Sequence, residues 1–174
     1  SLITMTCRSC TGHLNVRGSA STGATSAPGR GAVVATADRI TFSTRTTAAS
    51  TTSNLSQARV YVTAVSDGAT YGYSLGGDTV SGAAVVATAD RTTFSTSATA
   101  AYTAANLSAA RSGPSGVSDG AIYGYVAGGY NSVTNLTVTT ADRITFSSGA
   151  TAAYTGAALS AARWLGHAFS DGAV

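Results

Sequence analysis

The chain contains no lysine and no glutamate: its ten basic residues are all Arg and its seven acidic residues are all Asp. Charged residues make up 10% of the 174 positions, against roughly 25% in an ordinary soluble domain. This shortage excludes a charged disordered tail, a coiled coil and most helical cytosolic proteins. Apolar runs stay well below the roughly 18 residues of a membrane-spanning helix, so we expect no membrane insertion.

Large apolar side chains are also scarce, with one Trp, one Met, four Phe and eight Tyr. Ala, Thr, Ser and Gly together supply 105 of the 174 residues. Such a composition cannot build a thick core, but Gly and Ala allow strands and sheets to approach closely. The net charge of +3 comes from scattered Arg. Nucleic acids require a dense basic face, so we expect no nucleic-acid binding.

A repeat of 52 residues dominates what is present. The step links Asp38, Asp90 and Asp142, and residues 33–84 align with 85–136 without a gap at 30 identical positions of 52. A third copy starts at Thr137. We therefore predict a flexible Ser/Thr/Gly-rich N-terminal arm, followed by a repeat domain. The arm covers residues 1–32, and the domain covers 33–174 with repeats 33–84, 85–136 and 137–174.

Each repeat predicts short strands separated by turns. Residues 85–95 are rich in β-branched side chains, which favour strands. Asp119-Gly120 lies between two further β-prone runs and indicates a hairpin. The Ala-rich stretches 98–105 and 150–153 have helical propensity, but their repeat context favours a loop or an outer strand. The fold class is therefore predicted to be all-β.

In the second copy, Arg111 is followed in order by Asp119-Gly120, Tyr123 and Gly128-Gly129. This order resembles the kelch motif, in which an Arg precedes a hairpin with an acidic-Gly turn, an aromatic residue and a double glycine. The resemblance covers 33–174 and recurs at a period close to that of kelch units. The chain is also similar to Gly-Gly-Tyr-rich repeat proteins of bacteria and phages, some of them associated with virion tails or cell surfaces. The matching residues are Arg59, Asp67-Gly68, Tyr71 and Gly76-Gly77 in the first copy; Arg111, Asp119-Gly120, Tyr123 and Gly128-Gly129 in the second; and Arg163 and Asp171-Gly172 in the third.

This resemblance implies a β-propeller with one four-stranded blade per repeat. Propellers usually close with about four to eight blades, and three repeats supply at most three. We therefore expect either a part of a larger closed propeller or a propeller completed by oligomerisation. A fragment of a longer gene fits equally well, and a start at Ser1 together with a stop inside a repeat favours it.

Residues that recur in every copy are predicted to serve structure. The Asp-Arg pairs that begin at Asp38, Asp90 and Asp142 are expected to cap turns or pair with neighbours rather than to form a ring of ligand-binding charges. An Arg side chain can bind turn carbonyls or an adjacent Asp. The expected structural residues are the repeated Arg side chains and the double glycines: Arg59, Arg111, Arg163, Gly76, Gly77, Gly128 and Gly129. We also expect packing between blades by Tyr71, Tyr73, Tyr123 and Tyr125.

Ligand-binding residues are sought in the loops where the copies differ. Asp78 follows the double glycine of the first copy, and Tyr130-Asn131 replaces it in the second. Trp164 follows the Arg of the third copy, where the others have Val60-Tyr61-Val62 and Ser112-Gly113-Pro114. Tyr130 and Trp164 could stack on sugar rings; burial between blades is the alternative.

Two further patterns leave alternatives open. Cys7 and Cys10, with His13 nearby, could be an incidental pair, three of the ligands of a zinc ion, or a redox motif. Asn54, Asn106 and Asn135 each begin an N-glycosylation acceptor pattern, and the first two recur through duplication.

The list of catalytic candidates is poor, because Glu is absent and neither His lies beside a convincing nucleophile. We predict a non-enzymatic binding or scaffold module with no cofactor, which recognises a glycan or protein surface through its loops. The resemblance places it outside the cell or on a virion or cell surface. The alternatives are a self-assembling structural protein that forms homo-oligomeric rings or filaments, and a fragment of a propeller enzyme of the galactose-oxidase type.

Overall fold

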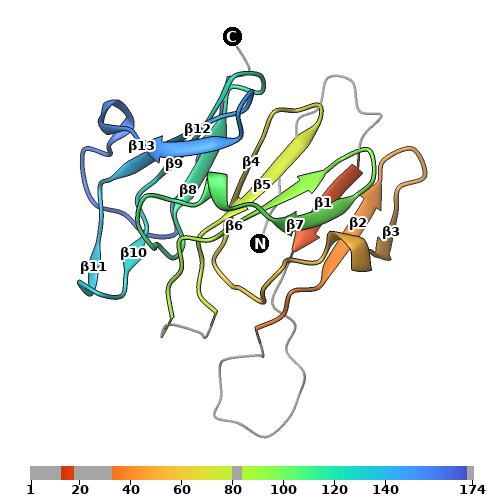
Figure 1. Ribbon diagram of the computed structural model, residues 1–174, viewed down its shortest axis with the longest axis horizontal. Coiled ribbons are helices and arrows are strands. Elements are labelled where there is room, and N and C mark those ends of the chain that lie inside the picture. Colours follow the sequence, from red (N-terminus) through yellow and green to blue (C-terminus); the bar gives the residue numbers. More distant parts are fainter. Residues whose placement is uncertain (1–12, 18–32, 80–83, 172–174) are drawn as a thin grey trace, which may run out of the picture.

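The computed structural model describes residues 13–17, 33–79 and 84–171. It confirms the all-β prediction, since these ranges contain strands and short 3-10 helices but no α-helix. The strands form several antiparallel sheets, in which neighbours along the chain are mostly neighbours in the sheet (Figure 1). The Ala-rich stretches form outer strands followed by single 3-10 turns, as their context predicted.

Three sheets make up most of the structure. Sheet 1 contains β1 (His13–Arg17), β2 (Ala37–Thr41) and β3 (Thr46–Ala49). Sheet 2 contains β4 (Thr63–Ser66), β5 (Tyr71–Leu75), β6 (Ala89–Thr93) and β7 (Ala98–Ala101). Sheet 3 contains β8 (Ser115–Ser118), β9 (Tyr123–Ala127), β12 (Ala141–Thr145) and β13 (Ala150–Ala153). The remaining elements are the hairpin of β10 (Tyr130–Asn131) and β11 (Leu136–Thr137), and the 3-10 helices η1 (Thr51–Ser53), η2 (Thr103–Ala105) and η3 (Thr155–Ala157).

The sheets are staggered relative to the sequence repeats. Sheet 2 takes β4 and β5 from repeat 33–84 and β6 and β7 from repeat 85–136. β5 pairs with β6 along its whole length, from Tyr71 opposite Thr93 to Leu75 opposite Ala89. Successive repeats are therefore joined by strand hydrogen bonds inside one sheet, so the unit of sequence and the unit of structure do not coincide.

Strand β1 lies inside the segment that the sequence predicted to be a flexible arm. It pairs with β2 from His13 opposite Thr41 to Arg17 opposite Ala37. This is the position that β5 and β9 hold beside β6 and β12. Cys7 and Cys10 lie outside the described residues, so the three interpretations of that motif stay predictions.

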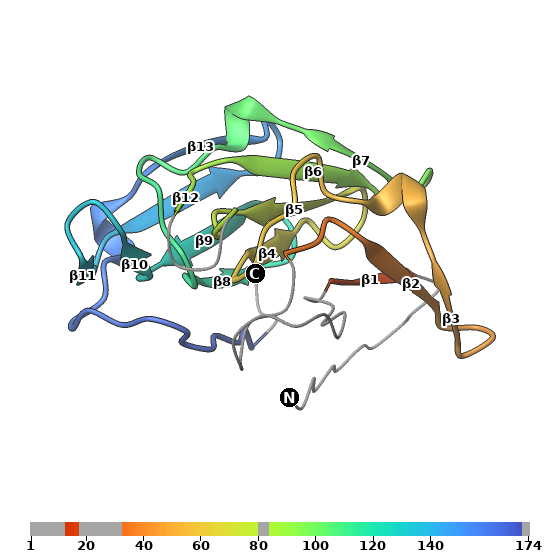
Figure 2. The ribbon, with the colours of Figure 1, turned by 90° about the horizontal axis from the view of Figure 1, so that it is seen from below.

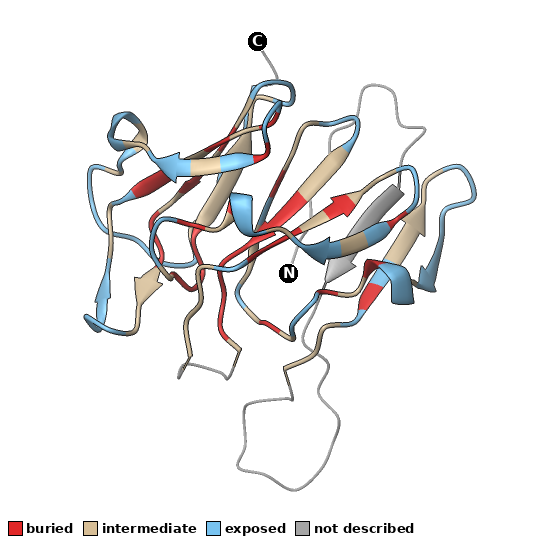
Figure 3. Cartoon of the chain, in the orientation of Figure 1, coloured by how far each residue is buried: buried red, intermediate tan, exposed pale blue. Residues whose placement is uncertain are grey.

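The main core lies between sheets 2 and 3. Sheet 2 lies between sheet 1 and sheet 3 (Figures 1 and 2). Tyr73 and Leu75 of sheet 2 are 1% and 0% exposed, and they belong to the same apolar cluster as Val126, Ile144 and Phe146 of sheet 3. Buried residues accordingly concentrate along the inner strands, and the outer strands and turns are exposed (Figure 3).

The double glycines allow two backbones to pass in close contact. Gly76 and Gly128 have φ of +67° and +69°, and the glycines that follow them are also left-handed. A Cβ atom on Gly76 would lie 2.5 Å from the carbonyl oxygen of Arg111. Any other residue would therefore combine backbone strain with a clash against main-chain atoms. The next glycine, Gly77, donates its N–H to that same carbonyl at 2.9 Å.

Asp119 organises the turn between β8 and β9. Its Oδ1 accepts the N–H groups of Ala121, Ile122 and Tyr123 at 2.8–2.9 Å, and Asp67 does the same in sheet 2. Partial desolvation raises the pKa of the Asp119 carboxyl, but the three backbone donors outweigh it, so the pKa lies below its ordinary value. The predicted Asp-Gly hairpin is thus formed, and the Asp side chain holds it closed.

We expect this turn to weaken in acid. Because the folded pKa of Asp119 is depressed, its contribution to the free energy of unfolding is complete above the ordinary Asp pKa of about 3.9 and is lost as the pH falls through the folded value. Asp119→Asn removes this titration. Its free energy of unfolding should change less than that of the wild type between about pH 5 and about pH 2, measured by urea denaturation. An unchanged pH dependence would contradict the assignment.

Candidate functional site

In sheets 2 and 3, a buried ion pair joins the sheet to the connection that precedes it. Arg111, between β7 and β8, pairs through Nη2 with Oδ2 of Asp142 in β12. Its Nη1 donates to the carbonyl oxygen of Thr140 at 2.6 Å. Both side chains are 0–1% exposed. Nη1 also donates to the carbonyl oxygen of Gly128 at 3.4 Å, so Arg111 joins the end of β9 to the start of β12 with one charged contact and two main-chain contacts.

The same arrangement recurs 52 residues earlier. Arg59 pairs with Asp90 and donates to the carbonyl oxygens of Gly76 and Thr88 at 2.8 and 2.6 Å. Burial lowers the pKa of both guanidinium groups, and the facing carboxylates oppose the shift, so the Arg side chains stay protonated. Arg163, at the third position of this series, has an exposed side chain.

In sheets 2 and 3, the second member of the Asp-Arg pair lies between aromatic rings. The Cζ atom of Arg91 is 4.4 Å from the ring centre of Tyr71 and 3.9 Å from that of Tyr102. Arg143 is sandwiched between Tyr123 and Tyr154 at 4.4 Å from each. In sheets 2 and 3 the repeated charges are thus engaged in packing, which leaves the loops as the place for a ligand.

One cluster of exposed aromatic residues forms in these loops, and we call Tyr61, Tyr130 and Trp164 the aromatic platform. The Trp164 ring centre is 5.9 Å from that of Tyr61 and 6.0 Å from that of Tyr130. Tyr61 and Trp164 are 44% and 45% exposed, and Tyr130 is half-buried. The sequence predicted Tyr130 and Trp164 as stacking residues, and the structure brings them into contact.

Hydrogen bonds between equivalent loop positions hold the platform together. Gly113 donates its N–H to the carbonyl oxygen of Tyr61, and its own carbonyl accepts from Leu165, both at 2.9 Å. Gly113 also lies under the indole ring, because a Cβ atom there would be 2.3 Å from Nε1 of Trp164. Three loops, each 52 residues apart, thereby converge on a single surface.

Tyr61 was missed by the sequence prediction. Its φ of +56° is the left-handed conformation, shared by Leu165 and by Gly113 at the same repeat position. A bulky residue in this conformation is strained, and such strain is concentrated at functional loops. The signal that could have found Tyr61 is that this position differs in each copy, as Tyr, Gly and Leu.

Two other predicted ligand residues serve the structure. Asp78 is 2% exposed and exchanges main-chain hydrogen bonds with Val60 at 2.9 Å, so its carboxylate is not accessible to an external ligand. Asn131 accepts the N–H groups of Val133 and Thr134 at its Oδ1 and so closes the β10–β11 turn. Burial of Asp78 argues against ligand contact there, and the Asn131 amide oxygen is used within its own turn, so ligand contact by these two side chains stays a prediction.

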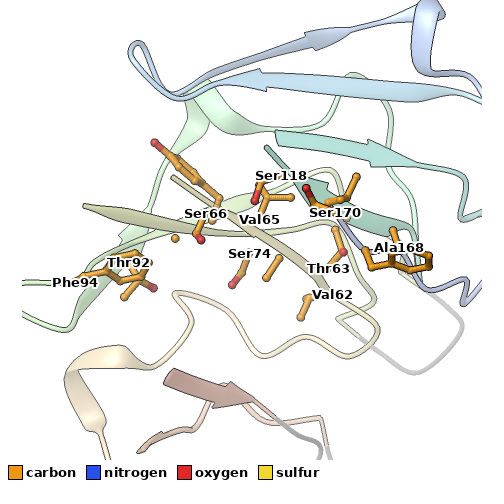
Figure 4. Close-up of a pocket in the computed structure, with 16 residues that line it drawn as sticks. Val62, Thr63, Val65, Ser66, Ser74, Thr92, Phe94, Ser118, Ala168 and Ser170 are labelled. Carbon is orange, nitrogen blue, oxygen red and sulfur yellow. The ribbon is translucent and has the colours of Figure 1, made fainter. Parts of the chain in front are cut away.

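Two cavities lie near the platform. The first, of about 500 Å³, begins at Tyr61 and Leu165 and continues past Pro114 to His167. The second, of about 590 Å³, lies along β4 and β5 and reaches Ala168 and Ser170; Figure 4 shows the hydroxyls of Ser66 and Ser74 beside it. Both volumes suit a small ligand. The second is lined by small apolar residues, Phe rings, a Tyr and Ser/Thr hydroxyls, which suit hydrogen bonding better than acid–base chemistry.

Within the described ranges, His, Cys, Asp and Glu side chains do not gather in groups of three or more that could hold a metal ion. In that same part of the chain, no helix has the length and apolar character needed to cross a membrane.

A scan against protein-family models finds no match, and a search of curated proteins finds no significant similarity to this chain.

Proposed function

We propose that this chain is a non-catalytic binding and scaffold module that recognises a glycan or protein surface through the aromatic platform. One observation carries the proposal: the rings of Tyr61, Tyr130 and Trp164 meet on the surface from three different repeats. Exposed aromatic rings stack on the apolar faces of sugar rings and on side chains of a partner. The cavity beside Tyr61 provides room for a group that extends beyond the rings.

The proposed architecture is a kelch-like β-propeller in which sheets 1 to 3 are blades. The meander of sheets 2 and 3, the buried Arg, the acidic-Gly hairpin turns and the double glycines support it. In this arrangement the sheets act as a rigid spacer and the variable loops carry recognition. By resemblance, the proposed location is extracellular or on a virion or cell surface.

Titration with neutral oligosaccharides tests the proposal, with intrinsic fluorescence as the readout because Trp164 is the single tryptophan. A bound sugar ring should shift this emission saturably. Tyr61→Ala should weaken binding about tenfold or more, since a central aromatic contact contributes at least about 1.4 kcal/mol. Trp164→Ala should have at least as large an effect by calorimetry.

The matched control is Val133→Ala, which removes an 89% exposed side chain from the neighbouring β10–β11 turn. It should bind like the wild type. If neither oligosaccharides nor a panel of surface proteins bind, or if the platform variants bind as well as Val133→Ala, the proposal fails.

A further inference from the structure

The outer face of sheet 3 carries an apolar groove of about 520 Å³. It is lined by Val117, Tyr125, Tyr154, Leu159, Arg163 and His167, together with small residues. Val117, Tyr125, Tyr154 and Leu159 are half-buried and Arg163 is exposed. An accessible apolar face of this kind on a β-sheet indicates a surface to which another element can dock.

The same positions in sheet 2 form the core of the protein. Val65, Tyr73 and Leu107, 52 residues before Val117, Tyr125 and Leu159, are 1–5% exposed. They are covered because sheet 3 places Ile144 and Phe146 against them. The groove on sheet 3 is therefore equivalent to the face of sheet 2 against which β12 packs. The sequence of β12 is Ala-Asp-Arg-Ile-Thr, and Phe146 follows it.

This chain has a second strand of that sequence. β2 and β12 both read Ala-Asp-Arg-Ile-Thr, and each is followed by Phe. In β12 the Asp and Ile are buried against sheet 2, whereas in β2 Asp38 is exposed and Ile40 and Phe42 are only half-buried. The face of β2 that corresponds to the docking face of β12 is thus accessible to solvent.

The charges at these two surfaces are complementary. Arg163 holds the repeat position of Arg111, and Asp38 holds the position of Asp142. In the described part of the chain, neither Arg163 nor Asp38 belongs to an ion pair. Thr36 precedes Asp38 as Thr140 precedes Asp142, so β2 has at the same position the residue whose carbonyl accepts from Arg111 in sheet 3.

We propose that a second copy of this chain docks on the groove of sheet 3, with its β2 in the place that β12 takes on sheet 2 and its Asp38 paired with Arg163. The interface is head-to-tail, because two different surfaces of each copy meet. Such an interface gives a ring where the rotation closes and a filament where it does not. The inference goes beyond the binding role of the aromatic platform and does not depend on it.

Sedimentation velocity and light scattering of the full chain over a wide concentration range test this proposal. The wild type should form dimers or larger species as concentration rises. Arg163→Asp and Asp38→Arg should each remain monomeric, since each places like charges at the interface. A mixture of the two variants should associate again. Asp38 of the Arg163→Asp chain can pair with Arg163 of the Asp38→Arg chain, and the two substituted side chains carry opposite charges and can pair with each other.

The matched control is Arg45→Asp, which makes the same charge change at an exposed position in the turn between β2 and β3. It should associate like the wild type, and circular dichroism of all variants should be unchanged because none of the three positions is buried. A wild type that is monomeric at every concentration overturns the proposal. So does association that Arg163→Asp and Asp38→Arg leave unaffected.

Discussion

Replacing Arg111 by Ala is expected to lower the free energy of unfolding by about 3–5 kcal/mol, because it leaves a buried carboxylate without its cation. Asp142 is 0% exposed, and Arg111 supplies its charged contact. Arg111 also donates to the carbonyl of Thr140, which loses that donor in the variant. Urea denaturation at neutral pH measures the change.

The repeat provides a matched control for this experiment. Arg163 holds the same position 52 residues later, and its side chain is exposed. At concentrations where the chain is monomeric, Arg163→Ala should change the free energy of unfolding by no more than about 0.5 kcal/mol. Equal effects of the two substitutions would mean that burial of the ion pair is not the source of its contribution.

A double substitution separates the ion pair from the packing of its side chains. Arg111→Met with Asp142→Leu replaces both charges by apolar groups, and such replacements are often neutral or stabilising. We expect the double variant to recover most of the stability that Arg111→Ala loses. A double variant as unstable as the single one would show that the hydrogen bond to Thr140 matters more than the removal of the unpaired charge.

The second large effect is expected at Tyr73, the centre of the core between sheets 2 and 3. Its ring is 1% exposed, stacks on Phe146 at 6.0 Å between ring centres and meets Tyr102 edge-on at 6.2 Å. Tyr73→Ala should lower the free energy of unfolding by about 3–5 kcal/mol, as other buried aromatic deletions do. Thermal unfolding followed by circular dichroism provides the measurement.

Two variants sharpen this second prediction. Tyr125 has the same place in sheet 3 but is half-buried, so Tyr125→Ala should cost about 1–2 kcal/mol. The Tyr73 hydroxyl is buried without a hydrogen-bond partner among the described residues; burial raises its pKa, and the positive charge of Arg91 only partly opposes the shift. Tyr73→Phe should therefore be neutral or slightly stabilising. A loss comparable to Tyr73→Ala would mean that the hydroxyl, and not the ring, holds the sheets together.

The local features of the fold followed from the sequence because they depend on neighbouring residues. The Asp-Gly turn at Asp119 was predictable, since an Asp side chain reaches the N–H groups two to four residues later. The double glycine at Gly128 was predictable as a site of close backbone approach, although its partner, the carbonyl of Arg163, was not. The 52-residue period fixed which positions would be equivalent.

The candidate site was only partly predictable, because equivalence in sequence does not give distance in space. Tyr130 and Trp164 were predicted as separate stacking candidates. Main-chain hydrogen bonds of Ser112 with Tyr130, and of Gly113 with Tyr61 and Leu165, bring the three rings together. Asp78 stood in a variable loop position, as a ligand-binding residue would, yet the loop folds back on Val60 and buries it. A variable position can thus serve packing as well as binding.

The repeat, the strand and turn composition and the residues used again in each copy could all be read from the amino-acid order. How the copies share strands, the pairing of β1 with β2, and which member of each equivalent set is buried depend on contacts between the sheets. Asp38 and Asp142 have the same neighbours in sequence, yet one is exposed and the other is 0% exposed. The physical reason is that burial depends on whether another sheet lies against that face, which no local sequence pattern specifies.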